Sequence, residues 1–180
     1  MEKKEFIAAS IKAMRLAGVT CRELKAYLQE TDTEAEAVSF EIVYADDSVS
    51  AEHINGKEIK GVIFVLEGRR VFISARYAPK VMNKRDSEKY CNSITVKGQP
   101  CTEGFRRYWV KCGLLHRYHE QINFVMEKLG LEQIDDRWIW SSSVFDCHYG
   151  ESWSIYPVSG DAYGSHEANY RYVRPIYVWD

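Results

Sequence analysis

The stretch GVIFVLEGRRVFISA, residues 61–75, decides the fold class of this chain. Its first six residues form a continuous apolar run, which is typical of a strand that is buried on both faces. Glu67-Gly-Arg-Arg70 has the composition of a turn, and a second apolar run follows from Val71 to Ala75. The stretch therefore predicts an antiparallel hairpin with a fully buried first strand.

A further strand is expected upstream, in residues 37–44. Apolar side chains occupy every second position of this segment, which is the period of a half-buried strand. The dipeptide Asn55-Gly56 is a strong hairpin signal because both residue types tolerate a positive φ. We therefore expect this dipeptide to turn the chain into the strand at 61–66.

Helices are predicted in the middle of the chain. Residues 86–94 and 114–129 carry apolar side chains at three- and four-residue spacing, and Gly130 ends the second segment. A further helix is expected to start at a Thr102 cap and to end at Gly113. The apolar faces comprise Tyr90, Cys91 and Ile94 in the first segment, Ile122, Val125, Met126 and Leu129 in the second, and Phe105, Tyr108, Trp109 and Cys112 in the capped one.

The last third of the chain returns to strands, at 138–141, 152–158 and 172–179. Strands, then helices, then strands imply an α+β domain whose two ends lie in one mainly antiparallel sheet. We expect residues 33–180 to form this domain.

Residues 1–32 are expected to form a separate N-terminal helical hairpin. An apolar stripe in residues 3–16 predicts its first helix, and a capping box that begins at Thr20 predicts its second. A helix-turn-helix role in DNA binding is disfavoured because acidic side chains accompany the basic ones on the second helix. We expect these helices to mediate oligomerisation or attachment to a partner.

Composition narrows the function classes. With 46% hydrophobic and 28% charged residues, the 180-residue chain has the balance of a soluble globular protein. The net charge of −2 argues against sequence-independent binding to nucleic acid. The N-terminus lacks an unbroken apolar core, and no window reaches the roughly 20 apolar residues of a membrane span. We expect a protein that is cytoplasmic as synthesised, with virion association as an alternative.

The chain has five cysteines at irregular spacing, without a CxxC pair or histidines at metal-ligand spacing: Cys21, Cys91, Cys101, Cys112 and Cys147. The simplest interpretation is a set of reduced and mostly buried thiols. A disulfide between Cys91 and Cys101 in an exported form is the alternative.

Aromatic and small polar residues are concentrated in residues 138–180. This stretch contains Trp138, Trp140, Trp153 and Trp179, and Ser, Tyr, His, Asp, Asn and Gly lie between its short apolar runs. Binding surfaces favour these residue types because they combine contact area with hydrogen bonding at low entropic cost. The stretch therefore predicts a surface built to bind a ligand.

The motifs of this region resemble those of a known family. A strand hairpin and two helices precede WSSS (Trp140 to Ser143), and a Trp strand (Trp153 to Tyr156) and VRPI (Val173 to Ile176) follow it. Over residues 57–180 this order is similar to the C-type-lectin-like domains of a bacterial and phage family, abundant in gut Bacteroidetes. Some members are the variable proteins of diversity-generating retroelements. The resemblance implies a mainly antiparallel sheet with two packed helices and long irregular loops.

In that family the residues between WSS and VRP form the ligand-facing surface, so the resemblance implies a protein or glycan partner. Carried over by position, the ligand-facing residues are Asp146, His148, Tyr149, Tyr156, Asp161, Tyr163, Ser165, His166, Asn169 and Tyr170. The corresponding scaffold residues are Trp140, Trp153, Arg174 and Pro175. The chain departs from the family at 112–116, where CGLLH replaces the usual Leu-Pro turn, and this puts the loop geometry there in doubt.

Neither a metal nor a cofactor is expected. The chain lacks the Glu-Pro-Asn and Trp-Asn-Asp motifs of calcium-dependent animal lectins, and Asp146, Glu151 and Asp161 do not form a recognisable calcium loop. Arg174 admits two interpretations. Its guanidinium either bonds loop carbonyls or stacks on a tryptophan, or it is simply exposed.

Two alternatives to a binding module stay open. Formylglycine-generating oxidases share the fold class, and Cys147 beside His148 could be an activated thiolate. Adjacent residues of a strand point to opposite faces, however, and His116 with His119 lacks a third metal ligand, so we expect a protein that is not an enzyme. The other alternative is a structural or assembly component of a phage or cell-surface particle.

Overall fold

The computed structural model describes residues 38–107, 114–144 and 150–179. The expected N-terminal helices, most of the expected helix after Thr102, and Cys21, Cys112 and Cys147 lie outside these residues. Within them the protein is a mixed α+β structure with mostly antiparallel sheets and two helices, as the sequence predicts. Neither helix has the length and apolar composition needed to cross a membrane.

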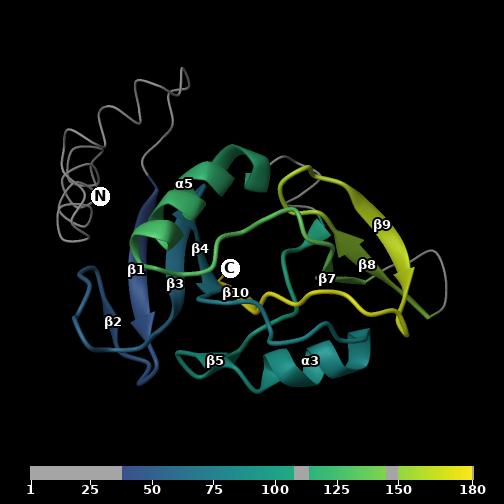
Figure 1. Cartoon of the computed structure of the whole chain (residues 1–180), viewed down its shortest axis with the longest axis horizontal. Coiled ribbons are helices and arrows are strands. Elements are labelled where there is room, and N and C mark those ends of the chain that lie inside the picture. Colours follow the sequence, from purple (N-terminus) through teal and green to yellow (C-terminus); the bar gives the residue numbers. More distant parts are fainter. Residues whose placement is uncertain (1–37, 108–113, 145–149, 180) are drawn as a thin grey trace.

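The predicted hairpin lies at the centre of a five-stranded antiparallel sheet (Figure 1). Its turn consists of Glu67 and Gly68, which have φ values of 48° and 78°. Two consecutive positive φ values match the right-handed twist of a tight hairpin. The strands run in the order β10 (Ile176–Trp179), β4 (Arg69–Ser74), β3 (Ile59–Leu66), β1 (Ser39–Tyr44) and β2 (Val49–Ser50). The expected union of early and late strands is therefore confirmed for β10.

Both faces of this sheet are buried, which explains the continuous apolar run of β3. Helix α5 (Leu114–Lys128) packs on one face, and helix α3 (Lys84–Asn92) lies on the other (Figure 1). Alternate residues of the strands divide between two core clusters. The first contains Val62, Phe64, Leu66, Val71, Ile73, Ile122, Val125 and Met126, and the second contains Val43, Ile63, Phe72, Cys91, Trp140 and Val173.

A second sheet extends the fold beside the first one. It has three antiparallel strands in the order β7 (Ile139–Val144), β8 (Glu151–Ile155) and β9 (Ala162–His166). A short hairpin of β5 (Thr95–Val96) and β6 (Gln99–Pro100) lies between the helices in the sequence. Strand β9 was not predicted, because its sequence AYGSH has no apolar alternation. Backbone pairing with β8, and not side-chain pattern, makes it a strand.

The expected turn at Asn55-Gly56 lies directly before β3: the N–H of Lys57 donates to the carbonyl of Ile54 at 3.2 Å, and Gly56 has a φ of 85°. A second turn lies directly after β1 at Asp46 and Asp47, where Asp47 has a φ of 60°. The unpredicted strand β2 lies between the two turns and pairs with β1.

Thr102 does not cap a helix. Its N–H donates to the carbonyl of Ile176 at 2.7 Å, and the N–H of Ile176 donates back at 3.0 Å. The backbone of Thr102 is therefore paired with β10, and residues 103–106, which follow it, are not helical.

Candidate functional site

An aromatic cluster lies on one face of the three-stranded sheet. It consists of Trp138, which precedes β7, Tyr156, which follows β8, and Tyr163 on β9. The ring of Trp138 lies 5.2 Å from that of Tyr156 and 6.0 Å from that of Tyr163, centroid to centroid. Tyr163 is 52% exposed. Tyr163 thus exposes part of its ring, while the ring of Trp138 is contacted by both tyrosines.

Arg171 covers the tryptophan of this cluster. Its guanidinium carbon lies 4.2 Å from the Trp138 ring centroid and 6.0 Å from that of Trp140. Nη1 donates to the carbonyl of Tyr170 at 2.9 Å, and Nη2 donates to the Ser165 hydroxyl at 3.3 Å. Burial lowers the pKa of Arg171. Stacking and two hydrogen bonds therefore hold this cation in one place.

Two buried hydroxyl groups support the cluster from beneath. The indole N–H of Trp138 donates to the hydroxyl of Ser154, which lies 2.6 Å from the hydroxyl of Ser165. Both serines are at least 96% buried, since Ser154 is 0% and Ser165 is 4% exposed. The Ser154 hydroxyl gives the partly buried indole N–H a hydrogen-bond partner.

The segment before α3 anchors the same face. The backbones of Met82 and Arg171 exchange hydrogen bonds of 2.9 and 3.0 Å. The indole of Trp140 is fully buried and donates to the Met82 carbonyl at 2.9 Å. Cluster, arginine and anchoring segment therefore form one rigid unit.

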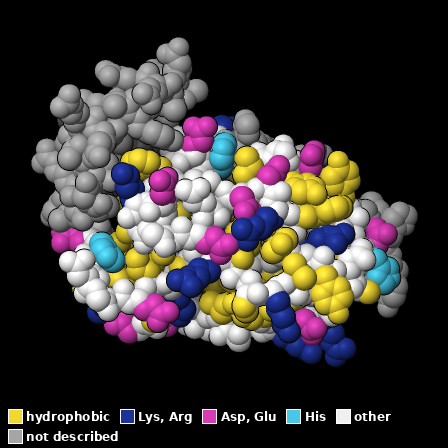
Figure 2. Space-filling view, viewed as in Figure 1, with side chains coloured by type: hydrophobic (Ala, Val, Ile, Leu, Met, Phe, Trp, Pro, Cys, Tyr) yellow, Lys and Arg dark blue, Asp and Glu magenta, His cyan; other side chains and the backbone are white. Residues whose placement is uncertain are grey.

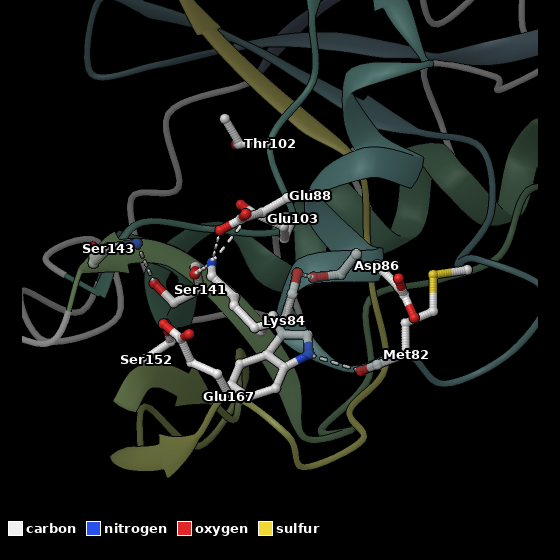
Figure 3. Close-up of polar contacts among 12 residues, drawn as sticks. Met82, Lys84, Asp86, Glu88, Thr102, Glu103, Ser141, Ser143, Ser152 and Glu167 are labelled. Carbon is white, nitrogen blue, oxygen red and sulfur yellow. Dashed lines mark hydrogen bonds and ion pairs between the residues drawn. The ribbon is translucent and has the colours of Figure 1, made fainter. Parts of the chain in front are cut away.

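A buried ion pair involves Lys84, two residues after Met82 (Figure 3). The amine of Lys84 lies 3.0 Å from Glu103 Oε1 and also donates to the Ser141 carbonyl at 3.0 Å. Lys84 is 7% and Glu103 6% exposed. The carboxylate of Glu88 lies 3.8 Å from the same amine, and burial raises its pKa. The pair of Lys84 and Glu103 therefore joins α3 to the segment that follows β6, and the bond to Ser141 joins α3 to β7.

The two closing scaffold residues are also buried. Arg174 is 0% exposed, and its Nη2 donates to the carbonyl of Glu132 at 2.7 Å. Its guanidinium carbon lies 4.6 Å from the Tyr77 ring. Arg174 thus bonds a loop carbonyl as the first interpretation expects, but it stacks on a tyrosine and not on a tryptophan. Pro175, beside it, is buried where the chain enters β10.

The predicted ligand-facing residues divide into three groups. Tyr156 and Tyr163 meet in the aromatic cluster, and Tyr170 is 62% exposed next to Arg171. Ser165 is buried beneath the cluster, so it supports the surface and is not part of it. Asp161, His166 and Asn169 are exposed and lie in turns or at strand ends, away from the contacts of the cluster. Asp146, His148 and Tyr149 lie outside the described residues.

Trp153 lies on the opposite side of β8 from the cluster. It is half-buried, and the guanidinium carbon of Arg107 lies 3.7 Å from its ring. The sheet thus carries an arginine stacked on a tryptophan on each face. Both stacks cover tryptophan rings that would otherwise contact water.

Two residues of the surface were missed by the sequence analysis, Trp138 and Arg171. One signal for Trp138 was available, because it lies two positions before Trp140 and side chains two apart share a face of an extended chain. Arg171 carries no comparable signal. It reaches the cluster through backbone pairing with Met82, a contact between distant parts of the chain.

Thiols and metal ligands offer no competing site in the parts of the chain that are described. Cys91 and Cys101 are free and buried, which confirms the thiol interpretation for these two. Burial raises the pKa of both, that of Cys101 to about 12. Over residues 38–107, 114–144 and 150–179, the His, Cys, Asp and Glu side chains form no group of three suited to a metal ion.

Comparison with known proteins adds no assignment: no protein-family model matches the chain, and no curated protein matches it significantly.

Proposed function

We propose that the chain is a non-catalytic ligand-binding module with a C-type-lectin-like fold, and that its partner is a glycan or a protein. The order of elements supports the fold. A strand hairpin (β3 and β4), helices α3 and α5, the Trp strand β8 and the closing strand β10 follow one another as in the family that the motifs resemble.

The observation that carries the binding function is the exposure of tyrosine on a rigid base. Tyr163 and Tyr170 are 52% and 62% exposed, and the residues beneath and between them are tied by stacking and hydrogen bonds. In the space-filling view, hydrophobic side chains lie among basic, acidic and histidine side chains over the part of the molecule that holds β7 to β9 (Figure 2). Tyrosine has only two rotatable side-chain bonds, so its ordering on binding costs little.

A rigid support makes such tyrosines effective. Side chains that already have their bound conformation lose less entropy when a ligand arrives. Ring faces stack on sugar rings or fill pockets of a protein, while the hydroxyl groups donate and accept hydrogen bonds. Aromatic anchors of this kind commonly dominate binding energy.

Binding to a glycan array and to bacterial surfaces tests the proposal with the full chain. Tyr163→Ala and Tyr170→Ala should each weaken binding at least tenfold, or about 1.4 kcal/mol. Ile54→Ala is the matched control, since Ile54 is 40% exposed but lies in the loop before β3. Equal binding by all three variants would contradict the proposed surface. Absence of any binding partner would favour a structural component of a phage or cell-surface particle.

A further inference from the structure

Arg137 and Arg171 both stack on aromatic rings but differ in their ion pairs. Arg137 lies 4.8 Å from the Tyr77 ring, and it forms ion pairs with Asp135 at 2.7 Å and Glu132 at 2.9 Å. Arg171 stacks on Trp138 at 4.2 Å and forms no ion pair with any residue in the described ranges. The positive charge of Arg171 is thus left without a counter-charge there.

Some N–H groups of the Arg171 guanidinium make no hydrogen bond to a described residue. A guanidinium has five N–H groups. Arg171 gives one to the Tyr170 carbonyl and one to the Ser165 hydroxyl, and its buried Nε has no partner. Each terminal nitrogen keeps a second N–H. A guanidinium that keeps an N–H on each terminal nitrogen can still donate to carboxylate oxygens.

The position of Arg171 makes an anion favourable. A charge that is partly removed from water without a partner costs free energy, and burial already lowers the pKa of this group. A bound anion would recover part of that cost. The exposed ring of Tyr163 lies 6.0 Å from the Trp138 ring that Arg171 covers, and the exposed Tyr170 precedes Arg171 in the chain; both tyrosines carry a hydroxyl group.

We propose that Arg171 binds the anionic group of the ligand, and that this ligand is a saccharide bearing a carboxylate, such as a hexuronic or sialic acid residue. The inference rests on the proposed function, because it assigns a ligand class to the same surface. The guanidinium takes the carboxylate, and the tyrosine rings take the apolar face of the sugar ring. A protein partner with an acidic side chain is the competing outcome.

The first experiment uses the unaltered chain, so it does not depend on a variant that folds. Binding is measured to uronic acid and sialic acid oligosaccharides, to the same sugars after reduction of the carboxylate to an alcohol, and to an acidic peptide. We expect binding of the acidic sugars and at least tenfold weaker binding of the reduced ones. Equal affinity for both forms would overturn the inference, and so would binding of the peptide alone.

Variants then locate the anion site. Arg171→Gln should lose at least tenfold in affinity for the acidic sugar and leave the affinity for the reduced sugar unchanged, while Arg171→Lys should fall between. Arg137→Gln is the matched control, since Arg137 is already neutralised, and it should bind normally. If Tyr163→Ala weakens binding but Arg171→Gln does not, the anion site is wrong and the proposed function stands. If no sugar or peptide binds, the inference is wrong, and the glycan-array and bacterial-surface assay decides separately whether the proposed function stands.

Discussion

Arg174 and Tyr77 form a buried stack, with the guanidinium carbon 4.6 Å from the ring centroid. Only one guanidinium nitrogen of Arg174 has a hydrogen-bond partner, since Nη2 donates to the carbonyl of Glu132 while Nε and Nη1 have none. Burial lowers the pKa of Arg174 to about 10 and raises that of Tyr77 to about 12. The arginine therefore contributes through packing and through one bond to a loop carbonyl.

Two variants of Arg174 separate the contribution of its side-chain volume to stability from that of its charge. Arg174→Ala should lower the free energy of unfolding by about 3 kcal/mol, because it leaves a cavity and an unbonded carbonyl. Arg174→Met, which keeps most of the volume and removes the buried charge, should cost less than half as much. Urea unfolding of both variants measures the difference. An equal loss in both would show that the charge itself is stabilising.

The buried pair of Lys84 and Glu103 should show strong coupling. Lys84→Met leaves the Glu103 carboxylate buried without its partner and should cost about 3–5 kcal/mol. The double variant Lys84→Met/Glu103→Leu removes both charges and should recover most of that loss. A double-mutant cycle in urea measures the coupling. Additive losses would mean that the two side chains do not depend on each other.

Substitution of two glycines compares the cost of a steric clash with the cost of backbone strain. A Cβ on Gly104 would lie 2.2 Å from the Trp140 carbonyl oxygen, so Gly104→Ala must displace backbone. A Cβ on Gly68 meets nothing within 4 Å, although its φ is +78°. We expect Gly104→Ala to cost more than about 2 kcal/mol and Gly68→Ala about 1 kcal/mol. Thermal unfolding of the two variants compares them, and the reverse order would contradict the contact.

The buried thiols should resist alkylation. Burial raises the pKa of Cys101 from 9.0 to about 12 and raises that of Cys91 as well. At about pH 8 the native protein should leave both unmodified by iodoacetamide, and denatured protein should react at both. Peptide mass spectrometry reads each site separately. Rapid alkylation of native Cys101 would contradict its burial.

The same shifts give a pH dependence of stability. Both folded-state pKa values lie above the ordinary value of 9.0, so the unfolded chain loses its thiol protons first. This contribution to stability is therefore complete below about pH 9 and is lost as the pH rises toward 12. Urea unfolding between these limits should show a smaller decline for Cys101→Ala than for the unaltered chain.

The local sequence pattern predicted the central hairpin and helix α5, because the spacing of their apolar side chains follows from which faces are buried. The run from Gly61 to Leu66, the turn at Glu67-Gly68 and the stripe of α5 all gave the observed structure. Errors arose where backbone pairing with a distant segment decided the conformation. Thr102 pairs with Ile176 and β9 pairs with β8, and neither segment has the side-chain pattern of its element.

The sequence by itself determined the fold class and the region rich in tyrosine and tryptophan, since apolar periodicity and composition are local properties. It also marked Tyr156, Tyr163 and Tyr170 as surface candidates. Only the tertiary structure decided which of them share a surface, that Ser165 lies beneath it, and that Arg171 stacks on Trp138. The physical reason is that this stack depends on the pairing of Met82 with Arg171, which are 89 positions apart in the chain (171 − 82).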